Sequence, residues 1–347
     1  MPGRLALRVC PDFLDHLSDG YRTIIVTGTN GKTTTTRMIS HMLASLAIDH
    51  VSNREGANEI SGIATTLGVD FRKRKTKPVA VLECDEYYLK AVAKALKPAI
   101  ILVTNIAEDQ TYRLISVDHV TAVLVDAIAQ NPRAICCVNG GNEACLRLKD
   151  KLIEGMVIDH QSYASDWQLF AAVNLPGKYN RENAAAACTV IKCLGLDVDR
   201  AAESLKHFKL PFGRMETLSV EGRDVLLVLA KNAVNLDLVI ETCSEQGRGG
   251  TLIFAVNNEM ADDITTDWIG QAKIEAVDKV FSEVLLCGKC AGEVKQRFFP
   301  QGRIITSVID EIRQSSGRVT IIANYTAMMQ IRGQLSKMGY THDFRED

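Results

Sequence analysis

The glycine-rich segment Gly28-Thr29-Asn30-Gly31-Lys32-Thr33-Thr34 constrains the fold of this chain more than any other stretch. It follows a short apolar run, Thr23–Val26, and leads into a helix-compatible run that begins at Thr33. A strand, a glycine turn and a helix in this order are typical of a phosphate-binding loop, because glycines let backbone N–H groups approach one anion and the helix N-terminus adds partial positive charge. In such a loop Lys32 reaches the β- and γ-phosphates of a nucleotide, and the Thr33 hydroxyl ligates Mg²⁺.

The spacing of the glycines is shorter than in the general pattern Gly-x-x-x-x-Gly-Lys-[Ser/Thr], since the chain has Gly-x-x-Gly-Lys-Thr. This difference indicates a particular branch of ATPases. The alternative is a Gly/Thr turn without a chemical role, which requires the lysine–threonine pair, the glycines and the strand-to-helix context to coincide by chance.

Composition limits the class of protein. A chain of 347 residues with 46% hydrophobic content is long enough for two domains, each with its own core. A net charge of −2 and a pI near 6.4 show no excess of basic residues of the kind that binds nucleic acid. The sequence has no apolar run as long as a membrane span and no signal peptide, so its ten cysteines predict reduced thiols and a cytoplasmic protein.

Apolar runs alternate with helix-compatible runs in two blocks, the first from Tyr21 to about Asp150 and the second from about Glu216. The alternation predicts an α/β fold, with a parallel sheet in the first block and a smaller Rossmann-like unit in the second. Pro211 and Gly213 suggest a hinge between them. We therefore expect a nucleotide-binding domain over residues 1–213 and a second domain over residues 214–347.

The individual elements follow from the same pattern. The predicted strands are Thr23–Val26, Val79–Glu83, Ile100–Thr104, Ala134–Val138, Val225–Leu229, Thr251–Val256, Lys279–Leu286 and Val319–Ala323. The predicted helices are Thr33–Leu46, Tyr87–Leu96, Val117–Ala129, Asn142–Lys151, Ala201–Phe208, Asp237–Gln246, Ser307–Gln314 and Tyr325–Lys337. Ligands of such sheets collect at the carboxyl ends of the strands, so the residues that follow each strand matter most.

Acidic side chains end the second predicted strand, in Glu83-Cys84-Asp85-Glu86. One carboxylate there is the expected second protein ligand of Mg²⁺, and we choose Glu83. For Asp85 and Glu86 we favour the alternative, an acidic cluster that complements the N-terminal end of the next helix.

Polar side chains also follow the next strand, at Asn105, Asp109 and Gln110. They could reach a metal or a phosphate. An equally good alternative is that they cap the helix beginning at Val117 or satisfy local backbone groups.

Two later segments add candidates. Asn180 and Asn183 lie one turn apart on one face of an alanine-rich helix, where Asn183 could present its amide to an adenine edge and Asn180 could instead cap the helix. Arg214 lies at the predicted domain junction, where closure could bring its guanidinium to a γ-phosphate; an ion pair with Glu216 is the competing interpretation.

Two short patterns favour ordinary roles. Cys287-Gly288-Lys289-Cys290 has no second C-x-x-C to complete a zinc site, so two unremarkable thiols are expected. The basic run from Arg72 to Lys77 predicts a solvated loop rather than a patch for an anionic lipid or sugar phosphate.

Taken together, these segments resemble the Mur ligase superfamily of ATP-dependent carboxylate–amine ligases, and within it the MurT family. The resemblance covers nearly the whole chain, and the order of the motifs makes it specific. The matching motifs are the phosphate loop, Asn53–Asn58 with Gly62–Thr65, Glu83–Glu86, Thr104-Asn105 with Asp109-Gln110, Leu175–Asn180 with Asn183, Phe212–Glu216, Lys231-Asn232 and Tyr325–Met328.

The resemblance implies roles for individual residues. Lys32 and the amides from Gly28 to Thr34 would hold the ATP phosphates, and Thr33 and Glu83 would hold Mg²⁺. Gln110 stands where other Mur ligases carry a metal-binding histidine. Asn183 would contact adenine and Arg214 the γ-phosphate, so the implied catalytic residues are Lys32, Glu83 and Arg214.

The resemblance also implies a reaction. MurT-type enzymes phosphorylate the α-carboxylate of D-isoglutamate in a lipid-linked stem peptide, and ammonia from a GatD-like glutaminase subunit displaces the phosphate. This implies a carbon–nitrogen ligase of peptidoglycan synthesis, and thus of cell wall biogenesis and cell shape, working at the inner face of the membrane. The two other readings are a folylpolyglutamate synthase-like ligase that uses an amino acid as the amine, and a non-catalytic nucleotide-binding scaffold for a glutaminase.

Several departures from the MurT pattern lie outside the phosphate loop. No cysteine lies between Cys145 and Cys188, where MurT proteins usually carry a four-cysteine zinc ribbon, so we predict no zinc. In the second domain, Asp263 replaces a customary glycine and Ala233-Val234 follows Lys231-Asn232 in place of Pro-x-Gly. The motifs of the ATP site are retained and those of the second domain are altered. The acceptor or the partner can therefore differ from those of typical MurT proteins.

Overall fold

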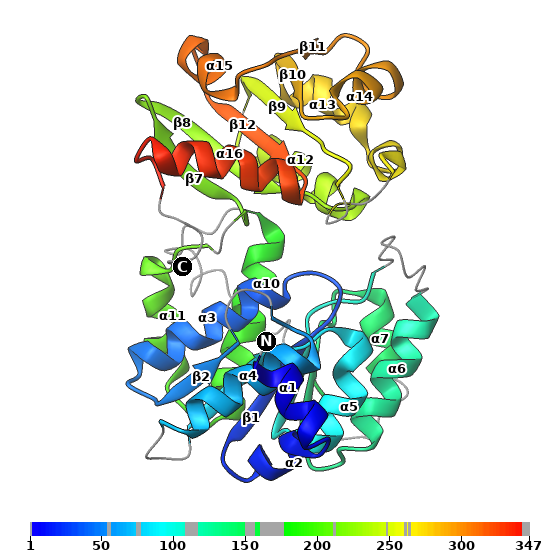
Figure 1. The fold of residues 1–347 in the computed structure, drawn as a ribbon, viewed down its shortest axis with the longest axis vertical. Helices are drawn as coiled ribbons and strands as arrows, with labels where there is room; N and C mark the ends of the chain where they lie inside the picture. Colours follow the sequence, from blue (N-terminus) through cyan, green and yellow to red (C-terminus); the bar gives the residue numbers. More distant parts are fainter. Residues whose placement is uncertain are drawn as a thin grey trace. The chain divides into compact units, whose positions relative to one another are not determined.

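A computed structural model gives the fold (Figure 1). It describes residues 2–53, 57–73, 78–107, 117–149, 157–159, 177–210, 213–247, 249–259, 262 and 265–341. These residues fall into two compact units, divided between Lys209 and Leu210, with Gly177 and Lys178 grouped with the second unit. The domain limits of 1–213 and 214–347 stay a prediction.

The first unit is built on a parallel sheet in the order β2-β3-β1-β4-β5-β6. Its strands are β1 (Arg22–Thr27), β2 (His50–Ser52), β3 (Val79–Glu83), β4 (Ile100–Val103), β5 (Ile135–Val138) and β6 (Val157–Asp159). Every residue of β3 and β4 is buried, as expected for central strands covered on both faces. In the register, Val26 of β1 lies beside Glu83 and Thr27 beside Val103, so the strands end together.

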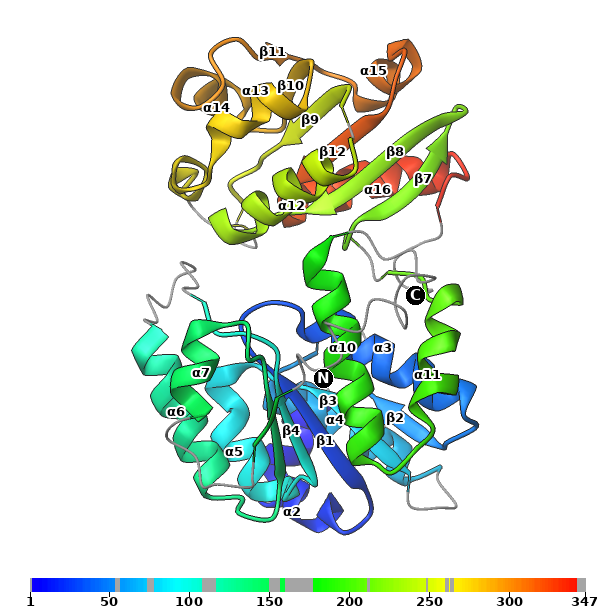
Figure 2. The ribbon, with the colours of Figure 1, turned by 180° about the vertical axis from the view of Figure 1, so that it is seen from behind.

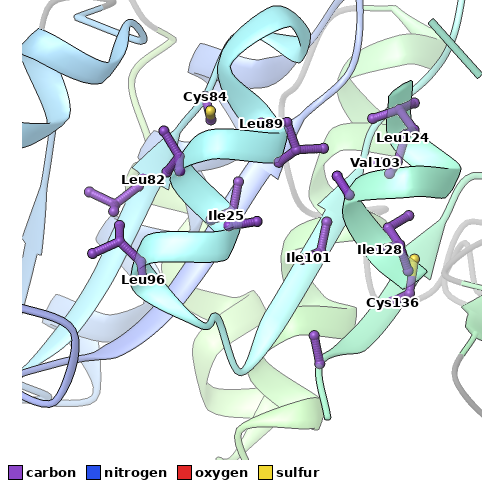
Figure 3. Packing of buried hydrophobic residues seen from close by; sticks show 14 of the residues in the cluster. Ile25, Leu82, Cys84, Leu89, Leu96, Ile101, Val103, Leu124, Ile128 and Cys136 are labelled. Carbon is purple, nitrogen blue, oxygen red and sulfur yellow. The ribbon is translucent and has the colours of Figure 1, made fainter. Parts of the chain in front are cut away.

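Helices cover both faces of this sheet (Figures 1 and 2). They are α1 (Pro2–Val9), α2 (Phe13–Ser18), α3 (Lys32–Ser45), α4 (Ile60–Phe71), α5 (Glu86–Leu96), α6 (Val117–Ala129), α7 (Glu143–Lys149), α10 (Lys178–Cys193) and α11 (Val198–Ser204), which continues into a 3-10 turn, Leu205–His207. Ile25 and Ile101 of the sheet pack against Leu89 of α5 and Leu124 of α6 in the main core of this unit (Figure 3). On the other face, α3 packs against α11.

The second unit has a sheet in the order β11-β10-β9-β12-β8-β7, which is parallel except for the antiparallel pair β7–β8. Its strands are β7 (Glu216–Val220), β8 (Arg223–Leu229), β9 (Thr251–Ala255), β10 (Glu283–Cys287), β11 (Arg303–Ile304) and β12 (Val319–Ala323). Its helices are α12 (Ala233–Glu245), α13 (Val277–Val280), α14 (Ala291–Arg297), α15 (Val308–Gln314) and α16 (Tyr325–Lys337), with 3-10 turns Asp267–Gln271 and Ile274–Ala276. Glu221 and Gly222, with φ of 52° and 75°, form the tight turn between β7 and β8.

The α/β fold with two sheets confirms the predicted class, and strands Val79–Glu83 and Val319–Ala323 have the predicted limits. The strand predicted over Lys279–Leu286 is wrong in its first half. Residues Val277–Val280 are helical and β10 begins only at Glu283. Val277 and Phe281 are both buried, and this spacing of four residues follows the period of a helix rather than that of a strand.

The sequence pattern missed the four edge strands and several short helices. They are β2, β6, β7, β11, α1, α2, α4, α13 and α14. The helix predicted from Asp237 begins earlier, at Ala233, because the side chain of Asn232 accepts a hydrogen bond from the backbone N–H of Asn235 and caps it.

Among the helices of the described residues, none combines the length and the apolar character needed to cross a membrane.

Candidate nucleotide-binding site

The predicted phosphate loop joins β1 to α3 and is folded around two glycines in left-handed backbone conformations. Gly28 has φ of +117° and Gly31, which precedes the first residue of α3, has φ of +84°. A Cβ atom at Gly28 would lie 2.5 Å from Thr104 Oγ1, and one at Gly31 would lie 2.4 Å from Asn183 Oδ1. Only glycine therefore fits at either position, because any side chain would be strained and would collide.

The end of β4 braces the loop from one side. The side chain of Asn105 accepts a hydrogen bond from the backbone N–H of Asn30 at 3.0 Å and donates to the Asn30 carbonyl at 2.8 Å. Thr104 Oγ1 donates to the same carbonyl at 2.6 Å, and the N–H of Thr29 donates to the Asn105 carbonyl at 2.9 Å. Of the two alternatives for Asn105, the structure supports the local one: its amide satisfies the backbone of the phosphate loop.

These hydrogen bonds decide which loop amides can serve an anion. The N–H groups of Thr29 and Asn30 are already donated to Asn105. The first turn of α3, from Lys32 onward, contains N–H groups that have no acceptor within the helix. The first turn of α3 therefore offers more free N–H groups to a phosphate than Thr29 and Asn30 do, and the predicted contact of Thr29 and Asn30 with ATP stays a prediction.

Glu83 lies at the end of β3, beside the end of β1, and is buried with 3% of its surface exposed. Its Oε1 accepts a hydrogen bond from Asn58 Nδ2 at 3.0 Å. Asn53 holds its backbone from both sides, accepting from the Glu83 N–H at 2.8 Å and donating to its carbonyl at 2.7 Å. The structure thus adds Asn53 and Asn58 to the site; the sequence signal for both was their place in a matching motif, which carried no role.

Lys32 fills the space between the phosphate loop and the start of α5. Its Nζ donates to the Gly28 carbonyl, to the Thr29 carbonyl at 3.3 Å and to Glu86 Oε2 at 3.1 Å. Burial by itself would lower the pKa of Lys32, but the negative charges of Glu86, Glu83 and Asp85 outweigh it and raise the pKa above its ordinary value. Lys32 is therefore a charged ammonium group.

The neighbouring Asp85 has the role that the acidic-cluster alternative predicts. Its side chain accepts a hydrogen bond from the N–H of Tyr87 at 3.0 Å and caps α5. Glu86 occupies the first turn of the same helix but also forms the ion pair with Lys32.

Helix α10 closes the loop from its other side. Asn183 is buried with its Oδ1 against Gly31, and its Nδ2 donates to Asn180 Oδ1 at 3.4 Å. The capping role considered for Asn180 is wrong, because the helix already begins at Lys178 and Asn180 is fully buried within its first turn.

Arg214 is half-buried just before β7 and belongs to the second unit, so its role toward a nucleotide stays a prediction. The carboxylate of Glu216, the partner in the competing interpretation, pairs with Arg332 at 3.3 Å and accepts from Thr341 Oγ1 at 3.1 Å. Asp109 and Gln110 lie outside the described residues, and the metal role of Gln110 stays a prediction. Cys287 and Cys290 are free thiols.

Comparison with known proteins finds two family models that match this chain and several similar proteins. A model of the Mur ligase middle domain matches residues 26–152, and a model of the MurT ligase C-terminal region matches residues 229–328. The MurT subunit of lipid II isoglutaminyl synthase (glutamine-hydrolyzing) from Streptococcus pneumoniae is 27% identical, with 97% of this chain and 92% of that protein covered. The corresponding subunit of Staphylococcus aureus strain COL is 24% identical over the same shares of both chains.

Solved structures agree on the fold. MurF from Acinetobacter baumannii superposes with a TM-score of 0.74 at 14% identity, covering 96% of this chain and 80% of MurF. Folylpolyglutamate synthase of Mycobacterium tuberculosis, solved with ADP, gives a TM-score of 0.74 at 15% identity, covering 95% and 94%. The chain therefore has the fold of the Mur ligases, and models of the Mur ligase middle domain and of the MurT ligase C-terminal region match its first and its second part in order.

Proposed function

We propose that this chain is the ligase subunit of a lipid II isoglutaminyl synthase: it uses ATP to activate a carboxylate as an acyl phosphate, which ammonia then converts to an amide. The carboxylate would be the α-carboxylate of D-isoglutamate in a lipid-linked stem peptide. The observation that carries the proposal is the cradle between β1 and α3, in which two glycines leave no room for a side chain and Lys32 stands at the helix N-terminus. Nucleotide phosphates are the usual ligands of such a cradle.

A divalent cation fits the residues around the cradle. Thr33 lies in the first turn of α3, and Glu83 offers a buried carboxylate at the neighbouring strand end. Hydroxyl and carboxylate oxygens are the ligands that Mg²⁺ prefers, and we propose Thr33, Glu83 and Gln110 as those residues. The cation would neutralise charge on the phosphates and on the oxygen from which phosphate leaves.

The chemistry needs positioning more than it needs a reactive side chain. A carboxylate is a poor acyl donor until one of its oxygens becomes part of a phosphate leaving group, so the protein must align the carboxylate with the γ-phosphate and offset the charge that develops. Lys32 is already a charged ammonium group at the phosphate loop, and Arg214 would supply a planar second cation. Asn183 would contact the adenine from its place beside Gly31.

A partner is part of the proposal. The similar chains from S. pneumoniae and S. aureus are named as subunits of a glutamine-hydrolysing enzyme. We infer that a GatD-like glutaminase supplies ammonia to this chain, and that a lipid-linked substrate brings the pair to the inner face of the membrane.

The second candidate is a ligase that joins an amino acid to a carboxylate, which the similarity in fold to folylpolyglutamate synthase favours. The third is a nucleotide-binding scaffold without turnover. Ammonium ions and amino acids as alternative co-substrates separate the two ligases, and the absence of phosphate release with every substrate and partner identifies the scaffold.

Phosphate release from ATP in the presence of Mg²⁺, lipid II and ammonium tests the proposal. We expect Lys32→Ala to abolish release, because the variant loses the cation beside the phosphates. Lys90→Ala is the matched control, since Lys90 on α5 is an exposed lysine paired with Asp126. Full turnover by Lys32→Ala would contradict the proposed site.

A further inference from the structure

The ammonium group of Lys32 has no donor left for a phosphate in this conformation. A lysine has three N–H donors and no acceptor. All three find acceptors: the Gly28 carbonyl, the Thr29 carbonyl and Glu86 Oε2. Binding of a nucleotide by Lys32 therefore requires that one of these three partners be exchanged for a phosphate oxygen.

The three partners differ in how readily they can be exchanged. The two carbonyls belong to Lys32's own loop, three and four residues before it, and stay beside it whenever the loop keeps its fold. Glu86 comes from a separate element, the first turn of α5. Its carboxylate is also the one negatively charged partner, so an arriving phosphate repels it and competes with it for the same cation.

The other acidic groups near Lys32 are already engaged within the described part of the chain. Glu83 accepts from Asn58, and Asp85 accepts from the N–H of Tyr87. Glu86 alone among these three forms an ion pair with Lys32, and both side chains are largely shielded, with 13% of Lys32 and 16% of Glu86 exposed. Shielding strengthens the pair relative to an exposed one.

A released Glu86 would keep a favourable place. It lies in the first turn of α5, where the partial positive charge of the helix N-terminus stabilises a carboxylate. When the ion pair opens, the Glu86 carboxylate is still stabilised by the N-terminus of α5. The contact between Glu86 and Lys32 can therefore break and form again.

We propose that Glu86 is the resting counterion of Lys32, a positioning residue that the γ-phosphate of ATP displaces and that returns to Lys32 when the γ-phosphate has been transferred. This inference rests on the proposed function, since it deepens the role of the same phosphate loop. Glu86 then favours the release of ADP over that of ATP, because ADP retains only one of the two phosphates that Lys32 reaches and so competes less strongly with Glu86.

Direct binding of ATP and ADP to the full chain, measured by calorimetry with EDTA and again with Mg²⁺, tests the exchange. Glu86→Gln removes the charge and keeps the shape. We expect it to bind metal-free ATP about tenfold more tightly than the natural chain, with a smaller gain for ADP. Glu86→Ala is a second variant with the same expectation, should the glutamine form a new hydrogen bond to Lys32.

Asp85→Asn is the matched control, because it removes one negative charge at the adjacent position and asparagine still caps a helix. It should leave the affinity for ATP nearly unchanged. An equal gain in this control would show a general charge effect and overturn the counterion role of Glu86. Unchanged or weaker binding of metal-free ATP by both Glu86 variants would overturn it too, as would an equal gain for ADP.

Two further outcomes separate this inference from the proposed function. Weaker binding of ATP by Glu86→Gln only when Mg²⁺ is present would assign Glu86 to the cation and reject the exchange, while the nucleotide site would stand. If the natural chain and all variants failed to bind ATP under both conditions, the proposed function itself would be wrong.

Discussion

Asn105 and Asn30 are joined by two hydrogen bonds, in which the side-chain amide of one pairs with both backbone groups of the other. The pairing ties the phosphate loop to the end of β4, at a point where neither strand ladder nor helix satisfies those backbone groups. It fixes the loop before any ligand arrives, and a preformed loop has less conformational entropy to lose when it binds.

Asn105→Ala should loosen the loop. We expect a loss of about 2 kcal/mol in the free energy of unfolding, about 1 kcal/mol for each hydrogen bond, and a weaker affinity for ATP. Chemical denaturation and nucleotide binding measure the two effects. Gln130→Ala, which removes a hydrogen bond between exposed side chains, is the control and should change neither. If Asn105→Ala had normal stability and normal affinity for ATP, the phosphate loop would keep its conformation without Asn105.

Gly31→Ala should abolish nucleotide binding, because the new Cβ would lie 2.4 Å from Asn183 Oδ1 and force the loop or α10 to move. Gly195→Ala is the matched control: Gly195 has a similar φ of +75° but nothing within 4 Å of the added atom. The control should lose only about 1 kcal/mol of stability from backbone strain. Equal affinities of the two variants for ATP would show that the contact with Asn183 does not matter.

Glu216→Gln should destabilise the second unit, since Arg332 is buried with 4% exposed and would lose the negative charge of Glu216 beside it. Breaking one side of such a pair costs about 3 kcal/mol or more. Thermal unfolding measures the loss. Asp310→Asn, which breaks an exposed pair with Arg313, is the comparison and should have no measurable effect. Equal melting temperatures for both variants would contradict the importance of the buried pair.

The thiols should react in a definite order. A hydrogen bond with Cys137 lowers the pKa of Cys193, aided by the charges of Lys192 and Arg22, whereas burial raises the pKa of Cys145 to about 12. A lower pKa gives more thiolate at a given pH, so iodoacetamide near neutral pH should label Cys193 before Cys145. Mass spectrometry of the folded chain checks the order, and unfolded chain, in which both sites should react alike, is the control. Faster labelling of Cys145 would refute the assigned environments.

Much of the first unit could be predicted from local pattern. The strands that end at Glu83 and near Val103 are continuous apolar runs, and the glycines and lysine of the loop follow β1 directly. The strand predicted from Lys279 failed because Val277 and Phe281 face the core with helical spacing, which an apolar run alone does not distinguish from a strand.

A phosphate loop between a strand and a helix follows from the residues alone, because that signal is local and depends on the residue types at adjacent positions. The contacts that hold the loop come from the three-dimensional packing: Asn105 with Asn30, Asn183 against Gly31, and Glu86 with Lys32. Those partners come from strand ends and helices far apart in the chain, and the parallel sheet brings them to one edge. Contacts of this kind depend on register and packing, which no local pattern of residues encodes.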